Sequence, residues 1–186
     1  MKKAIILSAI LSVSLLNATT NKEIKMEAKA AIMKMGKTLK SNMKKNMKKG
    51  GAVQAAKFCS NKATDIEKDI NAQYKKGVSV KRISLKYRNP DNAPMDDEKV
   101  VLEQIQSDFN NGKKIPKMIV KQISKNEYKV YKPIFLEKKV CLKCHGDIHH
   151  RDKEAYKIIK SKYPNDKAID YKAGDFRGAF VAKIIK

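Results

Sequence analysis

The sequence contains no tryptophan, and aromatic residues make up only 6% of its 186 residues. Aliphatic side chains and eight methionines must therefore fill most of a core, for which the hydrophobic content of 42% is sufficient. Acidic residues are also scarce, because 19 Asp and Glu stand against 42 Lys and Arg, a formal charge of +23. This surplus indicates either solvated lysine faces or anionic partners, such as an acidic protein or a membrane surface. Nucleic acid is disfavoured, because no arginine-rich block with interleaved aromatics occurs.

Long apolar runs are absent beyond the N-terminus. Residues 1–18 combine Lys2 and Lys3 with an apolar run over residues 4–16 and the small residue Ala18. This arrangement is typical of a bacterial secretory signal peptide. The run is short for a transmembrane helix, and no cysteine follows it that could carry a lipid, so an uncleaved membrane anchor is the weaker alternative. We therefore expect export, to a periplasm, and one domain in the remaining chain.

Cysteine is rare, and two of the three cysteines lie in the pentapeptide CLKCH, residues 141–145. Exported proteins normally pair their cysteines as disulfides, but an odd number leaves at least one without a partner. C-x-x-C-H is the attachment signature of c-type haem, in which both thiols bond to one edge of the porphyrin. The sequence therefore predicts one covalent haem held by Cys141 and Cys144, with His145 as the proximal iron ligand.

Three other interpretations of this motif are weaker. A zinc site needs four ligands, and His149 and His150 follow at a spacing that fits no common zinc finger. A thioredoxin-like pair would open a helix early in a βαβ unit, whereas Gly146 and Asp147 are helix breakers. A plain disulfide between the two cysteines is the third alternative. We expect the two later histidines to be exposed loop residues; a role beside a haem propionate or in an adventitious metal site is the alternative.

Helical periodicity dominates the first part of the chain. Residues 21–49 predict an amphipathic helix, because apolar residues recur every three or four positions and lysines occupy the other face. Gly50 and Gly51 should end or bend this helix, and a second helix is expected over residues 52–75. Cys59 falls on the apolar stripe of the second helix, among small alanines. By its position it is either a small core residue or a thiolate ligand to a haem that approaches the helix closely.

The rest of the chain predicts strands with short helical insertions. The period changes to two after Gly77, and a helix capped by Asp96 or Asp97 should end near residues 110–112. A further short helix is expected over residues 152–162, and the motif at Cys141 should lie in a loop. Expected strands cover residues 80–88, 117–123, 127–135 and 178–185, with a hairpin across residues 125–126. The layout is α+β, with about four antiparallel strands.

Four sequence blocks resemble a known family. They are AAKFCS at 55–60, VKRISLKYRNPDNAP at 80–94, CLKCHGD at 141–147 and YPNDKAIDYKAGDFRGAF at 163–180. In order and spacing they are similar to exported single-haem proteins with a PAS-like fold, which include a cyanobacterial photosystem-associated cytochrome and sensor segments of histidine kinases. The resemblance implies a PAS-like haem c domain over residues 51–186, preceded by a helix over residues 19–50. It also implies that Cys59 ligates the iron opposite His145.

The resemblance further suggests a role for two arginines of the second block. Arg82 and Arg88 should project from the same strand face, where guanidinium groups could pair with the haem propionates. The alternative is a turn fixed by Asn89 and Pro90, with solvated arginines.

A His/Cys haem would have a low potential, because the thiolate stabilises ferric iron. We therefore expect low-potential electron transfer, with an acidic protein as the redox partner. A redox or gas sensor that binds NO or CO is the alternative. A haem peroxidase is less well supported, since no distal acid–base residue stands out. Association with a membrane surface and homodimer formation are left open by the sequence.

Overall fold

The computed structural model describes the backbone of residues 4–186 and the side chains of residues 21–186. The expected signal peptide includes residues 1–3 and the side chains of residues 4–18, which lie outside the described part. Export therefore stays a prediction. Within the described residues, no helix carries an apolar stretch long enough to cross a membrane.

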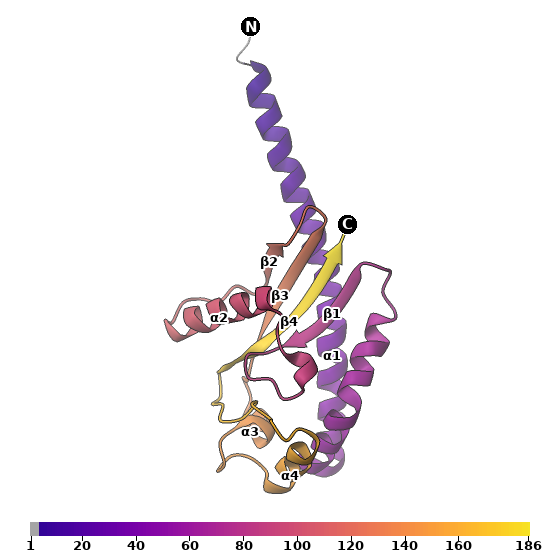
Figure 1. Cartoon of the computed structure of the whole chain (residues 1–186), viewed down its shortest axis with the longest axis vertical. Helices are drawn as coiled ribbons and strands as arrows, with labels where there is room; N and C mark the ends of the chain where they lie inside the picture. The colour runs from indigo at the N-terminus through magenta and orange to yellow at the C-terminus, as the bar shows by residue number, and fades with distance from the viewer. Residues whose placement is uncertain (1–3) are drawn as a thin grey trace.

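The first element, α1 (Ala4–Asn71), consists of two helical segments joined at a sharp bend. Gly50 and Gly51 interrupt the helix, and Gly51 has φ 64° and ψ −157°, which a residue with a side chain rarely adopts. We call these two glycines the elbow. The predicted bend is confirmed, and beyond it the chain returns alongside the first segment (Figure 1). The second segment ends earlier than predicted, where the Asn71 amide bonds the N–H and C=O of Val80 and ties the helix to the first strand.

Four antiparallel strands form one sheet in the order β1-β4-β3-β2. Their bounds are β1 (Val78–Ile83), β2 (Ile119–Gln122), β3 (Glu127–Phe135) and β4 (Phe176–Ile185). The predicted α+β class is confirmed, and β3 has the predicted bounds. β1 is shorter than predicted, because the Ser84 N–H donates to the Asn92 carbonyl instead of continuing the ladder, and only the Ser84 hydroxyl bonds β4, at the Arg177 carbonyl.

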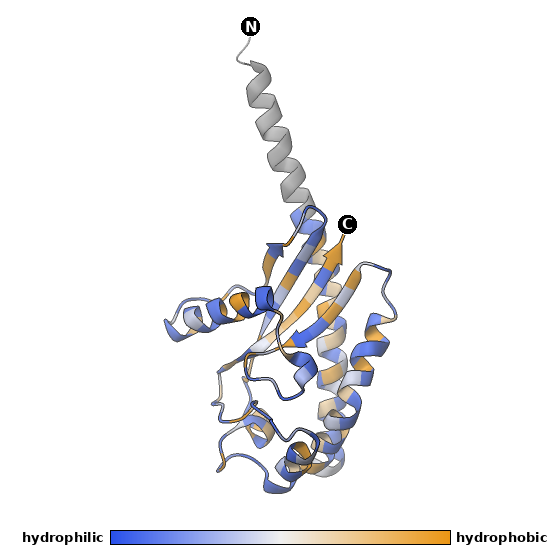
Figure 2. Cartoon of the chain, in the orientation of Figure 1, coloured by the Kyte–Doolittle hydropathy of each residue, from blue (hydrophilic) through white to orange (hydrophobic). Residues whose placement is uncertain are grey.

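Helices cover both faces of the sheet. The first segment of α1 packs Ile24, Ile32 and Met35 against Val80 and Val130 on one face. On the other face, α2 (Asp96–Asn110) buries three side chains against β1, β3 and β4: Val101, Leu102 and Ile105. Strand β4 is largely coloured as hydrophobic in Figure 2, as expected for a central strand between two helical layers.

The start of α2 differs from the prediction. Its N-cap is Met95, so neither Asp96 nor Asp97 caps the helix, and both lie in its first turn. The Glu98 carboxylate accepts the Met95 N–H at 3.0 Å instead. Glu98 is buried and also pairs with Lys129 of β3 at 3.2 Å, so ion pairing to the sheet decides where this helix begins.

Three short helices complete the fold: η1 (Pro90–Asn92), α3 (Lys139–His145) and α4 (Lys153–Lys162). The prediction that the C-x-x-C-H motif lies in a loop is wrong, because these residues form α3. Both α3 and α4 lie at the elbow end of the molecule, beyond the end of the sheet (Figure 1). Helix α4 starts as predicted, since the Asp152 side chain accepts the Ala155 N–H at 2.9 Å.

Candidate functional site

Helix α3 brings Cys141, Cys144 and His145 together within little more than one helical turn. Apolar contacts fix this helix against both segments of α1 and against α4. In particular, Cys144 belongs to a cluster with residues that flank the elbow and residues of α4: Met47, Ala52, Val53, Ala56, Ala155 and Ile159. Two of the four α1 residues in this cluster are alanines, whose small side chains let α3 approach the helix closely.

The His145 imidazole is held in one tautomer by the backbone. Its Nδ1 atom lies 2.9 Å from the Ala168 carbonyl oxygen, which can only accept, so Nδ1 carries the hydrogen. The Nε2 atom therefore has the free electron pair that binds a metal. Burial, followed by the charges of Arg88 and Arg177, lowers the pKa of His145 well below its usual range. The ring is neutral at physiological pH, which is the form required of an iron ligand.

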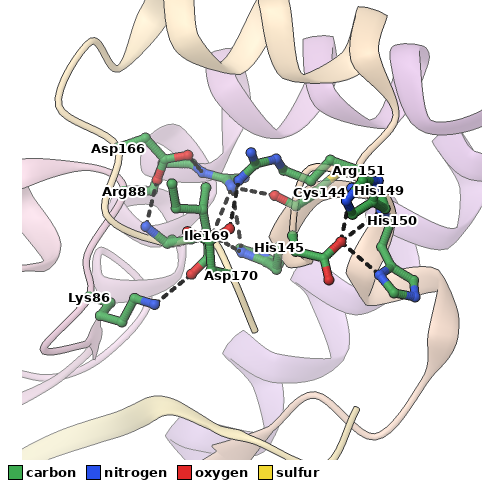
Figure 3. Close-up of polar contacts among 12 residues, drawn as sticks. Lys86, Arg88, Cys144, His145, His149, His150, Arg151, Asp166, Ile169 and Asp170 are labelled. Carbon is green, nitrogen blue, oxygen red and sulfur yellow. Dashed lines mark hydrogen bonds and ion pairs between the residues drawn. The ribbon is translucent and has the colours of Figure 1, made fainter. Parts of the chain in front are cut away.

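Arg88 clamps the end of α3 to the segment that carries Ala168 (Figure 3). Its guanidinium donates to the Cys144 carbonyl at 2.7 Å and to the Ala168 carbonyl at 3.3 Å, and it pairs with Asp166 at 3.1 Å. The Asp166 side chain has no exposed surface, and its other oxygen accepts the Ala168 N–H at 2.8 Å. Arg88 thus holds the carbonyl that orients His145, and Asp166 holds the N–H of the same residue.

Cys59 lies on the second segment of α1, one turn beyond Ala56 of the cluster that contains Cys144. All three cysteines are free thiols. Burial raises the pKa of Cys59, and the charges of Arg82 and Arg88 oppose this rise. Burial also raises the pKa of Cys144 to about 11; Arg88 opposes the rise and Cys59 adds to it. Cys144 packs in the cluster that includes Ala56, one turn before Cys59, so the two half-buried thiols lie at the same end of the molecule, although 85 positions separate them in the chain.

The expectation that Arg82 and Arg88 share one strand face is wrong, because β1 ends at Ile83 and only Arg82 belongs to it. The Arg82 Nε atom is buried without a hydrogen-bond partner, and its nearest carboxylate oxygen, on Glu67, lies 3.8 Å away. Arg88, by contrast, is engaged by protein groups. A propionate role for either arginine stays a prediction, and Arg82 has the unpartnered donor that such a role requires.

Sequence reasoning missed Asp166, Ala168, Tyr171 and Arg177, although all four lie in the quoted block 163–180. Arg177 donates to the Ser84 hydroxyl at 2.5 Å and to the Lys86 carbonyl at 3.1 Å, and burial lowers its pKa. The Tyr171 ring meets the His145 ring edge-on, with centroids 6.3 Å apart. The polar residues of this block were the available signal, but their partners lie far away in the chain.

Comparisons with known proteins decide the family. The family model described as Tll0287-like matches residues 17–184. The chain belongs to the Tll0287-like family. Among solved structures, that of the cyanobacterial heme-protein Tll0287 is 28% identical, covers 69% of this chain and 71% of its own, and superposes with a TM-score of 0.54. No curated protein sequence matches the chain. The resemblance drawn from the four blocks is thereby confirmed.

Within this Tll0287-like chain, the donor set fits a c-type haem. Cys141 and Cys144 are free thiols on one helix, His145 presents a neutral imidazole with Nε2 available, and Arg82 has a buried donor without a partner. A third thiol, Cys59, lies on the segment of α1 against which Cys144 packs. These residues could form two thioethers and supply two axial ligands.

The remaining two histidines do not join this site. His149 and His150 are exposed, and the ring of His150 bonds the Asp147 carboxylate at 2.8 Å (Figure 3). Across the described residues, no group of three His, Cys, Asp or Glu side chains is arranged to hold a metal ion. The expectation of exposed loop histidines is confirmed.

Proposed function

We propose that this chain is an exported, single-haem c-type protein that transfers electrons at low potential. Cys141 and Cys144 would hold the haem covalently, and His145 and Cys59 would be the axial ligands. Support for secretion comes from residues 1–18, and support for haem comes from membership of the Tll0287-like family.

One observation carries the proposal. His145 is fixed with Nδ1 on the Ala168 carbonyl, and the adjacent Cys144 packs against the helix that bears Cys59. A thioredoxin-like or disulfide role for Cys141 and Cys144 would make no use of an oriented imidazole. A haem, when bound, supplies one-electron redox chemistry.

The residues of the chain tune that chemistry in defined ways. The Ala168 carbonyl, held by Arg88, strengthens His145 as an electron donor to iron, because a hydrogen bond at Nδ1 raises ligand basicity. Cys59 would bring a negative charge into a site surrounded by Arg82 and Arg88. The thiolate favours the ferric state and lowers the potential, whereas the arginine charges limit this effect.

The test is expression with a haem-attachment system, followed by mass spectrometry and electron paramagnetic resonance of wild type and Cys59→Ala. We expect the mass of one covalent haem and a low-spin ferric signal with a sulfur charge-transfer band that disappears in the variant. Ser60→Ala, which changes the adjacent residue, is the control and should leave the spectrum unchanged.

Two results would reject the proposal. A mature chain without added mass would reject the covalent haem, and an unchanged spectrum in Cys59→Ala would reject the thiolate ligand.

Binding of carbon monoxide distinguishes an electron carrier from a gas sensor. A carrier keeps both axial ligands after reduction and does not bind the gas, whereas rapid binding to the ferrous protein would favour the sensor.

A further inference from the structure

A long acid-free stretch of the sequence folds around the elbow of α1. Residues 28–64 contain no Asp or Glu and ten lysines, all of which are exposed: Lys29, Lys34, Lys37, Lys40, Lys44, Lys45, Lys48, Lys49, Lys57 and Lys62. Within residues 21–186, Lys62 alone among these ten forms an ion pair, with Asp65 at 3.2 Å. The whole stretch therefore presents positive charge with almost no internal neutralisation.

The part of this stretch next to the elbow lies at the end of the molecule that carries the candidate haem site. Met47 and Ala52, on either side of the elbow, contact the cluster that contains Cys144. Further exposed lysines lie on and beside α3 and α4: Lys138, Lys139, Lys143, Lys153, Lys157, Lys160 and Lys162. Figure 1 shows the elbow, α3 and α4 gathered at one end, away from the hairpin between β2 and β3.

Four lysines just before the elbow form the densest part of this surface: Lys44, Lys45, Lys48 and Lys49, which we call the elbow lysines. Lys44 and Lys48, and likewise Lys45 and Lys49, are spaced i, i+4 on the helix, where like charges repel each other. The repulsion is not relieved within the described chain, since none of the four has an acidic partner there. An external anionic surface would relieve it.

We infer that the elbow lysines dock an acidic patch on a protein that exchanges electrons with this chain; the inference rests on the proposed function. Electron transfer requires close approach to the redox group, and the elbow contacts the cluster that contains Cys144. A protein is favoured over a membrane, because these lysines adjoin the cluster that contains Cys144, and only a partner that carries its own redox group makes use of close approach to the haem.

The test compares two variants of equal charge change in the haem-loaded protein. The elbow variant replaces Lys44, Lys45, Lys48 and Lys49 with Gln. The control variant replaces four other exposed lysines with Gln: Lys114, Lys117, Lys121 and Lys125. These control positions surround β2, near Met118, which packs against the cluster around Ile24 and so lies far from the elbow.

The measurement is the second-order rate of haem reduction by reduced flavodoxin, a small acidic electron donor, in a stopped-flow instrument. At low ionic strength we expect the elbow variant to react about tenfold more slowly, at the lower end of known electrostatic steering, and the control variant to stay within about twofold of wild type. The difference should disappear at about 1 M salt, where the Debye length is near 3 Å. Reduction by the methyl viologen radical, measured at about 1 M salt so that its positive charge is screened, should be equal in all three proteins.

Several outcomes would overturn the inference. Equal slowing of both variants would mean that net charge matters and the elbow does not, and no slowing would mean that the surface has no docking role. Binding of wild type to vesicles of phosphatidylglycerol and phosphatidylethanolamine, lost in the elbow variant while its reaction with flavodoxin is unchanged, would assign the surface to membranes.

A haem-independent readout separates this inference from the proposed function. Binding of fluorescein-labelled polyglutamate, followed by anisotropy, should weaken in the elbow variant and not in the control. If the chain carries no haem, the proposed function fails, but this measurement still decides whether the elbow binds an acidic polymer.

Discussion

The ion pair between Arg88 and Asp166 should stabilise the fold more strongly than any exposed pair. The Asp166 side chain has no exposed surface, and that of Arg88 is 16% exposed, so solvent screens their interaction little. In Arg88→Met the carboxylate would stay buried without its partner. The Cys144 and Ala168 carbonyls would also lose a donor.

The magnitude follows from these contacts. Removing one partner of a buried ion pair costs about 3–5 kcal/mol in the free energy of unfolding. For a chain of this size, each kcal/mol changes the melting temperature by about 2–4 °C, so Arg88→Met should melt about 6–20 °C below wild type. Thermal and urea unfolding followed by far-ultraviolet circular dichroism would measure the change.

Two comparisons make this prediction strict. Lys157→Met is the control, because Lys157 pairs at 2.7 Å with Glu154, both side chains are exposed (73% and 66%), and an exposed pair contributes at most about 1 kcal/mol. The double variant Arg88→Met/Asp166→Asn removes the uncompensated charge and should be more stable than Arg88→Met. A loss in Arg88→Met no larger than in Lys157→Met, or a double variant less stable than the single one, would refute the reasoning.

Further predictions concern acid stability and one glycine of the sheet. Burial alone would raise the pKa of Glu98, but hydrogen bonds from Lys81, a backbone N–H and Lys129 hold it below its ordinary value of 4.5. Ionised Glu98 therefore contributes to the free energy of unfolding. This contribution is complete above about pH 4.5 and is lost as the pH falls through the folded-state pKa. Between about pH 6 and pH 3, the urea midpoint should therefore decline less in Glu98→Gln than in wild type. Equal declines would contradict this assignment. Gly178→Ala should destabilise by more than about 1 kcal/mol, because Gly178 has φ 142° and an added Cβ would lie 2.3 Å from a backbone oxygen of β1. Gly174→Ala, at φ 93° with no atom within 4 Å of the new Cβ, should cost less in the same urea titration, and the reverse order would show that the close contact is relieved elsewhere.

Local patterns predicted much of the fold. β3 has the predicted bounds, and the bend at Gly50 and Gly51 follows from the conformational freedom of glycine within a helical pattern. Local sequence patterns could not predict where β1 ends or that Cys141–His145 form a helix. The first depends on hydrogen bonds from Ser84 to Asn92 and Arg177, and the second depends on packing against α1 and α4.

The candidate site likewise has a part that the sequence predicts and a part that only the tertiary structure determines. Five consecutive residues contain the chemistry of C-x-x-C-H, and the lysine surplus is evident from composition, because covalent spacing and charge are properties of the chain itself. The orientation of His145 by Ala168, the buried pair of Arg88 and Asp166, and the nearness of Cys59 to Cys144 join positions 23 to 85 residues apart. No periodicity spans such separations; these contacts exist because the elbow folds α1 back on itself and buries α3 against it, excluding water from the groups that meet there.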